Sequence, residues 1–403
     1  MKPLTILLSR FCIFLICSVT GTNIVYAQFM DSFDGNRIEG WFVMTGDGAA
    51  TMEFVQHDGY ATMHVDATKD RYNVYWALIK RDVTTFLDLN KLKDPGYQLR
   101  VEARVRIHNA PRRLNFMVNT QRTTDFHKDL MEFDIPDTVN WHVISMTTKN
   151  FDAVPGDAVY VQLAATDFGT GRYRVDVDYY RADIVNVKDA GPDKGVQVPY
   201  HPPVPDISSF ENHLDVTHDA LINLDFPNVN FGNWHIRDIK SGKRVLTVSA
   251  NQWAILRWDF GSLKNASANG SALLELTTQS YASGGEYLRA YGGEFGMEFG
   301  KVRVFEIPGG DSEWDQHQVT FDSFMQGKSL PEVVNEQMLI DTEIDEAPGG
   351  RNLITISQPV LQRLLNGTTK GLLIRPLGAV DASFYDSENL TGCGPKLHFN
   401  LKQ

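Results

Sequence analysis

The chain has little cysteine, which limits how it can be stabilised. It holds three cysteines in 403 residues, and two of them, Cys12 and Cys17, lie near the N-terminus. Cys393 is the third, so once the N-terminal segment is removed an internal disulfide is excluded. The domains must then be large enough to hold together by burial of apolar surface alone.

The sequence also lacks a long hydrophobic run. The run Phe11–Val19 follows Lys2 and Arg10, and Ala27 ends a site with small residues where a signal peptidase cuts. This run is shorter than the ~20 apolar residues of a membrane-spanning helix, and no later run approaches that length. We therefore predict a signal peptide over residues 1–27, a secreted mature protein and no membrane span.

Basic charge is scarce as well. Lys and Arg number 38 against 50 Asp and Glu, which gives a net charge of −12. A nucleic-acid partner is therefore not expected. Hydrophobic residues at 42% and aromatic residues at 11% indicate a packed globular chain rather than a disordered one.

Amphipathic helical patterns are rare, and the best short candidate is Pro359–Leu365. Short segments with strand alternation, separated by turn residues, fill most of the chain. This pattern predicts an all-β protein with two β-sandwich domains of jelly-roll type. The predicted units are a sandwich over residues 28–187, a proline-rich linker over 188–210, whose five prolines argue against a regular ladder, and a sandwich over 211–403.

Two strands of the first sandwich have one apolar and one polar face. Residues 97–108 alternate apolar side chains with Arg, Gln, Glu and His, and residues 114–121 alternate apolar side chains with amides. If the two strands pair, they assemble guanidinium and amide groups on one surface. The same alternation also describes the solvated face of any antiparallel sheet.

Such a surface suits a glycan, because amides and arginines hydrogen-bond hydroxyl groups, arginine forks match a uronate carboxylate, and aromatic rings stack on sugars. The residues that we expect to bind substrate are Arg71, Tyr72, Trp76, Lys80, Arg104, Arg106, Asn115, Asn119 and Gln121.

Catalysis is the main alternative to binding alone. A polysaccharide lyase has to neutralise a uronate carboxylate and move a proton. Arg122 supplies the first function, and His127 or Tyr75 the second. The sequence has no nucleophile elbow, zinc-binding helix motif or phosphate-binding loop, so those enzyme classes are set aside.

Acidic residues at both ends of the first sandwich suggest a structural calcium ion, since Ca²⁺ takes hard oxygen ligands. The candidate ligands are Asp31, Asp34, Asp176 and Asp178. The opening Phe-Asp-Gly and the closing Asp-Val-Asp-Tyr-Tyr of this half resemble jelly-roll carbohydrate-binding modules and jelly-roll polysaccharide lyases.

The second half carries its own resemblance. Ile255–Phe260, Trp314 with Val319–Phe321, and Phe384–Glu388 with Gly394–Leu397 are similar in order and spacing to the DNRLRE-type carbohydrate-binding domain, a β-sandwich of secreted polysaccharide-degrading proteins. Phe321 stands where that pattern has tryptophan. The resemblance implies an accessory glycan-binding module. Read from the residues alone, Asp386 and Glu388 are structural ion-pair partners of Arg257 or Arg375.

These observations favour a secreted protein that binds a polysaccharide, an acidic one, through its N-terminal sandwich. A lyase acting in the same domain is the first alternative, and an extracellular matrix or adhesion protein is the second.

Overall fold

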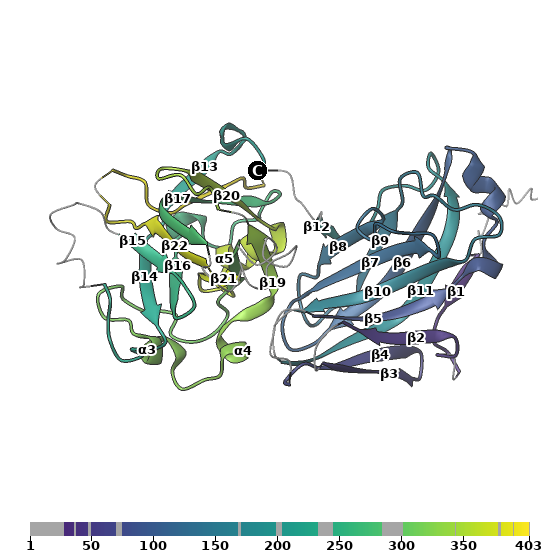
Figure 1. The fold of residues 1–403 in the computed structure, drawn as a ribbon, viewed down its shortest axis with the longest axis horizontal. Helices are drawn as coiled ribbons and strands as arrows, with labels where there is room; N and C mark the ends of the chain where they lie inside the picture. The colour runs from purple at the N-terminus through teal and green to yellow at the C-terminus, as the bar shows by residue number, and fades with distance from the viewer. Residues whose placement is uncertain are drawn as a thin grey trace, which may run out of the picture.

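The computed structural model describes residues 28–35, 38–46, 50–69, 75–167, 171–198, 204–232, 245–283, 301–342, 344–377, 380–389 and 391–402. They form two β-sandwiches side by side, with the N-terminal strands on the right of Figure 1 and the C-terminal strands on the left. The predicted all-β class and the two sandwiches are confirmed. Residues 1–27, where we predicted the signal peptide, lie outside the described residues. No helix among the residues described is long and apolar enough to cross a membrane.

The N-terminal sandwich consists of two six-stranded antiparallel sheets. Sheet A has the order β3-β4-β11-β6-β9, with β1 also paired to β11, and sheet B has the order β12-β8-β7-β10-β5-β2. The strands are β1 (Phe29–Asp31), β2 (Trp41–Thr45), β3 (Thr51–His57), β4 (Tyr60–Asp66), β5 (Tyr75–Asp82), β6 (Tyr97–Ile107), β7 (Arg113–Thr120), β8 (Leu130–Asp134), β9 (His142–Thr147), β10 (Val159–Asp167), β11 (Arg172–Asn186) and β12 (Val196–Val198).

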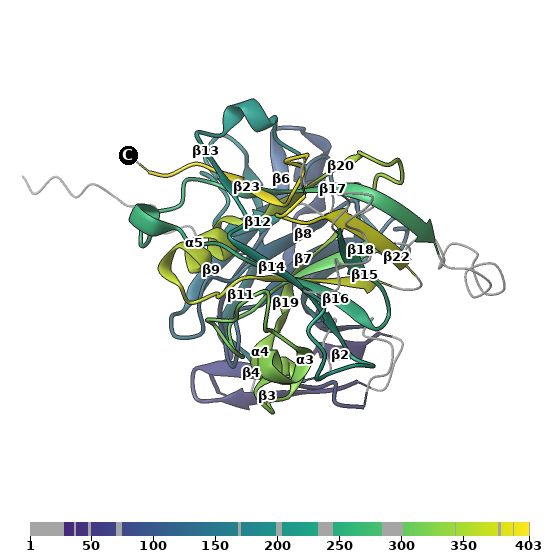
Figure 2. The same ribbon diagram turned by 90° about the vertical axis from the view of Figure 1, so that its left-hand side faces the viewer.

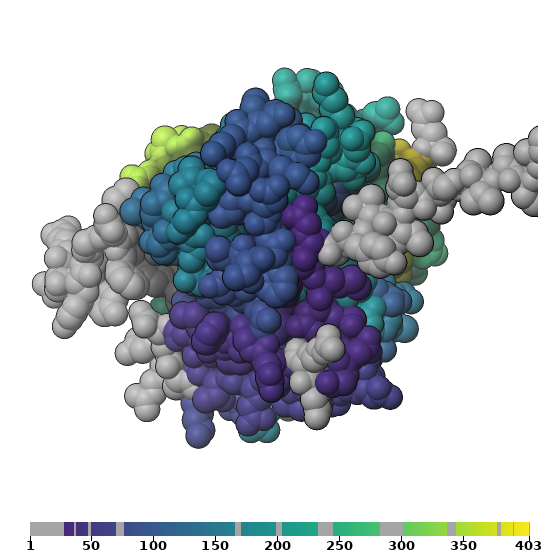
Figure 3. Space-filling model, turned by 90° about the vertical axis from the view of Figure 1, so that its right-hand side faces the viewer, coloured from purple at the N-terminus to yellow at the C-terminus, as the bar shows by residue number. Residues whose placement is uncertain are grey.

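One apolar core lies between these sheets. The alternate residues Leu99, Val101, Ala103 and Val105 of β6 are fully buried and face Phe116 and other residues of sheet B. Burial of this kind contributes roughly 25 cal/mol for each Å² of apolar surface removed from water. Each sheet therefore packs one face into the core and has a second, outer face that is free of the core. Figure 3 views this sandwich from its far end.

The two polar strands that we expected to pair do not. β6 lies in sheet A and β7 in sheet B, and the turn at residues 108–112 carries the chain from one sheet to the other. Their outer faces therefore point away from each other on opposite sides of the sandwich. Alternation fixes which side chains face the core, but it does not say which sheet a strand joins.

The proline-rich segment after β11 is also more regular than predicted. Ala190, Gly191 and Pro192 offer their carbonyls to the Arg100 guanidinium on the outer face of sheet A. The chain then crosses to sheet B, where β12 pairs with β8. Our expectation of no ladder here is wrong, because the prolines fall outside the three residues of β12.

Gly195 makes that crossing possible. Its φ is +89°, and an added Cβ would lie 2.8 Å from Ile144 Cγ2 and 3.1 Å from Phe133 Cδ1. Only glycine combines this left-handed conformation with such a close approach to the edge of the core.

The C-terminal sandwich has a six-stranded sheet, with the order β13-β23-β17-β22-β15 and β20 paired to β17, and a five-stranded sheet, with the order β14-β16-β21-β18-β19. The strands are β13 (Asn212–Asp215), β14 (His218–Asn223), β15 (Val245–Val248), β16 (Gln252–Arg257), β17 (Ala272–Ser283), β18 (Lys301–Glu306), β19 (Asn335–Thr342), β20 (Arg351–Ile356), β21 (Leu372–Leu377), β22 (Val380–Tyr385) and β23 (Lys396–Phe399).

Short helices complete this domain. α5 (Gln358–Asn366), close to the predicted Pro359–Leu365, buries Leu361 and Leu365 in the core between the sheets. α3 (Phe321–Met325) and α4 (Leu330–Val333) lie together at one end of the domain (Figure 2). Their segment packs Trp314 and Phe324 against the outer face of the five-stranded sheet, which gives this domain a third layer.

Candidate functional site

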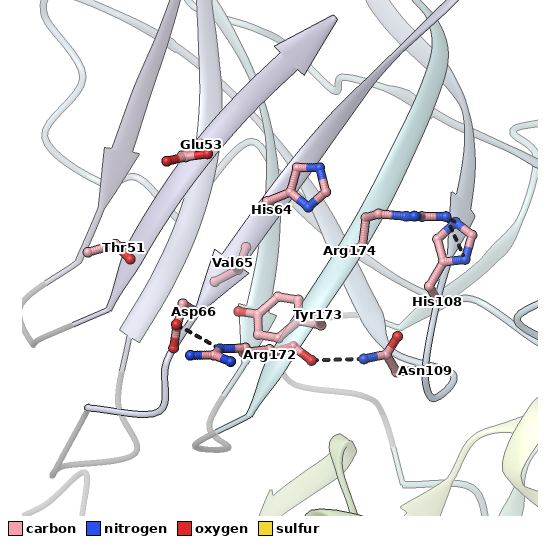
Figure 4. A pocket seen from close by; sticks show the side chains of 10 residues that line it. All are labelled: Thr51, Glu53, His64, Val65, Asp66, His108, Asn109, Arg172, Tyr173 and Arg174. Carbon is pink, nitrogen blue, oxygen red and sulfur yellow. Dashed lines mark hydrogen bonds and ion pairs between the residues drawn. The ribbon is translucent and has the colours of Figure 1, made fainter. Parts of the chain in front are cut away.

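A groove of about 520 Å³ lies at one end of the outer face of sheet A (Figure 4). This volume falls within the range of small-ligand sites. The groove is lined by Thr51 and Glu53 of β3, His64, Val65 and Asp66 of β4, Arg172, Tyr173 and Arg174 of β11, and His108 and Asn109 of the turn after β6.

Strand register explains why these side chains meet. Glu53 pairs with His64, and His64 pairs with Arg174, so the three form one row across β3, β4 and β11. Thr51, Asp66 and Arg172 form the next row in the same way. Side chains directly opposite each other on one face have Cβ atoms ≈ 4.5–5.5 Å apart, so each row acts as a unit.

The inner end of the groove is held by a buried carboxylate, Asp176, whose side chain is 0% exposed. Thr62 Oγ1 donates to it at 2.9 Å, Arg106 Nη2 at 2.8 Å and His108 Nε2 at 2.7 Å. Burial raises the pKa of Asp176, but the hydrogen bonds from His108, Arg106 and Thr62 outweigh it, and the net pKa is lowered. The carboxylate therefore remains charged at neutral pH.

Asp176 in turn orders the cationic wall. Arg174 Nε lies 3.3 Å from Asp176 Oδ1, the oxygen that also accepts from Thr62. Arg174 Nη2 lies 2.8 Å from His108 Nε2 and 3.1 Å from His108 Nδ1. The Arg174 guanidinium thus lies against the His108 ring, beside the Asp176 carboxylate. Figure 4 shows the Arg174 guanidinium and the His108 ring side by side at the edge of the groove.

The outer rim is built from exposed groups. Arg172 Nε donates to Asp66 Oδ2 at 2.8 Å, and the Arg172 side chain is 74% exposed. Hydrogen bonds from Thr68, and then from Arg172, lower the pKa of Asp66 to about 2. Asn109 Nδ2 donates to the Arg172 carbonyl at 2.9 Å. The terminal nitrogens of Arg172 have no partner among the residues described and face solvent at the rim.

Aromatic rings continue the polar face away from the groove. The Arg106 guanidinium lies 4.6 Å and the Arg104 guanidinium 5.4 Å from the Trp141 ring centroid. Trp141 meets Tyr60 edge to face at 6.2 Å, and Tyr60 stacks on His57 at 4.7 Å. The outer face of sheet A thus runs from a polar groove to an aromatic and cationic patch.

The structure divides the expected substrate-binding residues between two surfaces. Arg104 and Arg106 lie on the outer face of sheet A, with Arg104 Nη1 2.8 Å from Asp178. The remaining described ones from β5 and β7 share the outer face of sheet B, and they are Trp76, Lys80, Asn115 and Asn119. Arg71 and Tyr72 lie outside the described residues.

The expected catalytic residues do not meet. Arg122 lies beyond the end of β7, where it donates to Asp157 at 2.7 Å and forms an ion pair with Asp152. Thr120 pairs with Val159 of β10, whereas Tyr75 pairs with Asp167, eight residues farther along that strand. At about 3.4 Å per residue the two ends are roughly 27 Å apart.

The other two residues at the Arg122 end have local partners as well. Gln121 Nε2 donates to Asp157 Oδ1 at 2.9 Å, and His127 Nδ1 lies 3.9 Å from Asp125 on an exposed loop. The Asp157 carboxylate therefore binds both Gln121, which we expected to contact substrate, and Arg122, which we expected to act in catalysis.

The four aspartates that we expected around calcium do not form one ligand set. Asp31 accepts hydrogen bonds from the Trp41 indole at 2.8 Å and the Phe33 amide at 3.0 Å. Asp34 accepts from Ser32, and Asp176 and Asp178 bind arginines on the opposite face of sheet A. Within the described part of the chain, no group of three or more His, Cys, Asp or Glu residues is placed to hold a metal ion.

Sequence reasoning missed most of the groove. Glu53, His64, Arg172 and Arg174 were not singled out, although residues 172–178 alternate Arg, Arg, Asp and Asp with apolar side chains. That alternation marked one charged outer face. It does not reveal the groove, because the groove also needs β4, whose pairing with β11 spans more than 100 residues of sequence, and β3, which pairs with β4.

In the C-terminal sandwich the expected ion pairs have different partners. Arg257 binds Glu313 at 3.3 Å and the Trp314 carbonyl at 3.0 Å, and Arg375 binds Glu336 at 2.8 Å. Glu388 instead accepts from Gln316.

No protein-family model matches the chain, and no curated protein matches its sequence. Solved structures similar to it include the CBM22-1 xylan-binding domain from Paenibacillus barcinonensis Xyn10C, with 13% identity, 40% of this chain and 96% of that chain covered, and a TM-score of 0.26. The CBM22-1-CBM22-2 tandem domain of the same protein has 11% identity, 94% and 98% coverage, and a TM-score of 0.27.

A third similar structure is the family 11 carbohydrate-binding module from Clostridium thermocellum in complex with a β-1,3-1,4-mixed-linked tetrasaccharide. It has 12% identity, 38% of this chain and 92% of that chain covered, and a TM-score of 0.24. At these identities and TM-scores the matches carry no argument about the ligand of this protein.

Proposed function

We propose that the protein is secreted and binds an acidic polysaccharide along the outer face of sheet A. The observation that carries the proposal is the groove in which Arg172, Arg174, His64 and Asn109 come together on one face. The groove is open at the surface of the sheet, as a chain of sugars requires. Secretion rests on the signal peptide that the sequence predicts at residues 1–27.

The groove offers a partner for each part of a sugar acid. Glu53 and His64 present acceptor and donor groups suited to hydroxyls. The guanidinium groups of Arg172 and Arg174 match a carboxylate with paired N–H donors. Trp141 and Tyr60 lie farther along the same face and offer rings on which the apolar face of a sugar packs.

Affinity gel electrophoresis tests the proposal. We expect alginate, polygalacturonate or glucuronan in the gel to retard the wild-type protein, and xylan to retard it less. Arg172→Ala should abolish most of the retardation, because it removes a guanidinium group that lines the groove. The fold should tolerate the change, since this side chain is 74% exposed. Arg122→Ala is the matched control, an ion-paired arginine outside the groove, and should run like wild type.

Two results would contradict the proposal. Equal retardation of Arg172→Ala and Arg122→Ala would place the binding surface elsewhere. No retardation by any soluble glycan would favour a matrix or adhesion protein.

A lyase is the second candidate function, and one observation favours it. Two imidazoles, His64 and His108, line the same groove as the two arginines. In a β-elimination an arginine stabilises the charge on the uronate carboxylate while a base such as His64 removes the C5 proton. The C4–O glycosidic bond breaks as the C4=C5 double bond forms, and the leaving oxygen takes up a proton from the protonated base or from water. Growth of the ultraviolet absorbance of unsaturated uronates, lost in His64→Ala, would support the lyase. Retardation without absorbance growth would support binding alone.

A further inference from the structure

The turn that carries His108 and Asn109 lies between the groove and the C-terminal sandwich. On the groove side, the His108 amide donates to the Arg174 carbonyl at 3.0 Å and Asn109 Nδ2 donates to the Arg172 carbonyl at 2.9 Å. Asn109 has a φ of +78°, in the left-handed region that asparagine adopts more readily than most other residues with a side chain.

Arg112 fastens the base of the turn. Its side chain is buried, with the residue 1% exposed, and its guanidinium lies 3.9 Å from the ring centroid of Tyr173, which lines the groove. Arg112 Nη2 also donates to the His108 carbonyl at 3.2 Å. The turn therefore moves as a unit with Arg112.

The C-terminal sandwich forms a hydrogen bond to the other side of the same turn. Asn335, at the start of β19 and 4% exposed, donates from Nδ2 to the Pro111 carbonyl at 2.8 Å. The segment after β8 contacts the C-terminal sandwich as well, because Arg363 of α5 donates from Nη1 to the Pro136 carbonyl at 2.8 Å. The two segments touch each other, since the Ile135 amide donates to the Arg112 carbonyl.

A buried carboxylate holds the two side chains that make these contacts between the domains. Glu306, at the end of β18 and 1% exposed, accepts from Arg363 Nε at 2.8 Å, Thr369 Oγ1 at 2.7 Å and Asn335 Nδ2 at 3.0 Å. Asn335 and Arg363 are thus fixed within their own domain before they reach across. A polar network that is satisfied on both sides holds its members in one arrangement.

We infer that Asn335 is a positioning residue for the groove, and that docking of the C-terminal sandwich sets the His108–Asn109 turn in its ligand-ready conformation. The second domain is then part of the binding site without touching the ligand. The predicted change in glycan affinity rests on the proposed function, whereas the predicted change in the conformation of the turn does not. By linkage, a ligand in the groove stabilises the contact between the domains to the same extent.

Hydrogen exchange on the full-length, ligand-free protein tests the inference. Asn335→Ala should speed exchange of the amides of His108, Asn109, Ala110 and Arg112 by about fivefold or more, because the turn opens locally once its outer contact is lost. The matched control is Asn352→Ala, another buried asparagine of the same domain, which donates to Leu276 and Thr278 and makes no contact with the turn. It should leave exchange at 108–112 unchanged.

Binding gives the second readout. With alginate and polygalacturonate as probes, Asn335→Ala should weaken the affinity about fivefold or more, and Asn352→Ala should not. Unchanged exchange at the turn in Asn335→Ala would overturn the inference, and so would equal exchange in both variants, since that reports general destabilisation. If the wild-type protein binds neither probe, the proposed function fails in the acidic form tested, while the exchange result still decides the role of Asn335.

Discussion

The two outer faces of the N-terminal sandwich differ in chemistry, although their strands alternate in the same way. The face of sheet A gathers arginines and histidines around Asp176, and most of its charged groups are paired. The face of sheet B carries exposed apolar side chains near its β2 edge, with Phe42 at 60% and Trp76 at 38% exposure. The same alternation therefore places an ionic network on the outer face of sheet A and an apolar strip, formed by Phe42 and Trp76, on the outer face of sheet B.

The difference has a structural origin. Three strands of sheet A place charged residues in register, so opposite charges meet and share partners. On sheet B the amides of Asn119 and Gln162 bind each other at 2.6 Å and are buried, so they are not available to a ligand. Lys80 lies 4.3 Å from the Tyr160 ring, and burial lowers its pKa.

The largest expected effect comes from comparing two carboxylates on the outer face of sheet A, the buried Asp176 and the partly exposed Asp178. Asp176→Ala should cost about 3–5 kcal/mol of unfolding free energy, because Arg106, His108 and Arg174 lose their shared counter-charge. Asp178→Ala should cost less than about 1 kcal/mol, since Asp178 forms an ion pair with the partly exposed Arg104. Urea denaturation of both variants measures the difference. Equal losses would mean that the Asp176 cluster does not hold the face together.

The next largest effect is the pH dependence of stability, which should have opposite signs for Asp129, next to sheet B, and Asp176, on sheet A. Burial raises the pKa of Asp129, just before β8 of sheet B, to about 6. The folded state therefore favours the neutral acid, and this contribution is present below about pH 4 and lost as the pH rises through 6. Asp129→Asn should stabilise the protein by about 1–2 kcal/mol at pH 8, after allowance for partial exposure, and by little at pH 4.

Denaturation of wild type and Asp129→Asn at the two pH values checks this. The contribution of Asp176 to stability depends on pH in the opposite direction. Its lowered pKa gives stability that is present above the ordinary aspartate pKa and lost as the pH falls through the lowered value. A stabilising effect of Asp129→Asn that persists at pH 4 would contradict the assignment.

The smallest expected effect is on the apolar strip of sheet B. Phe42→Ser should change the unfolding free energy by no more than about 0.5 kcal/mol, because the side chain is mostly exposed. It should also leave retardation by acidic polysaccharides unchanged. A loss of retardation equal to that of Arg172→Ala would move the glycan site from sheet A to sheet B.

Much of the fold could be predicted from the sequence, and less of the site. The bounds of β6, Tyr97–Ile107, follow directly from its alternation, as does the burial of Leu99 and Val101. Pairing could not be predicted, because β7 shows a matching pattern and belongs to the other sheet. β1 and β12 were missed since three residues are too few to show a period.

The prediction of the site was wrong for the same reason as the prediction of strand pairing, because both depend on contacts between distant segments of the chain. Arg122 and His127 were chosen as a group because they are neighbours in sequence, but nearby carboxylates already hold Arg122. The groove instead joins residues near 53, 64, 108 and 173, which only the register of three strands brings together. Arg104 and Arg106 were found because their own strand places them on the correct face.

The segment after β11 fixes where the first domain can be separated from the second. A protein that stops at Val187 would leave Arg100 without the carbonyls of residues 190–192, and Glu102 without Lys194. It would also remove β12, the strand that closes one edge of sheet B. The shortest N-terminal fragment that keeps both sheets intact therefore ends after Val198, beyond the boundary that composition alone suggests.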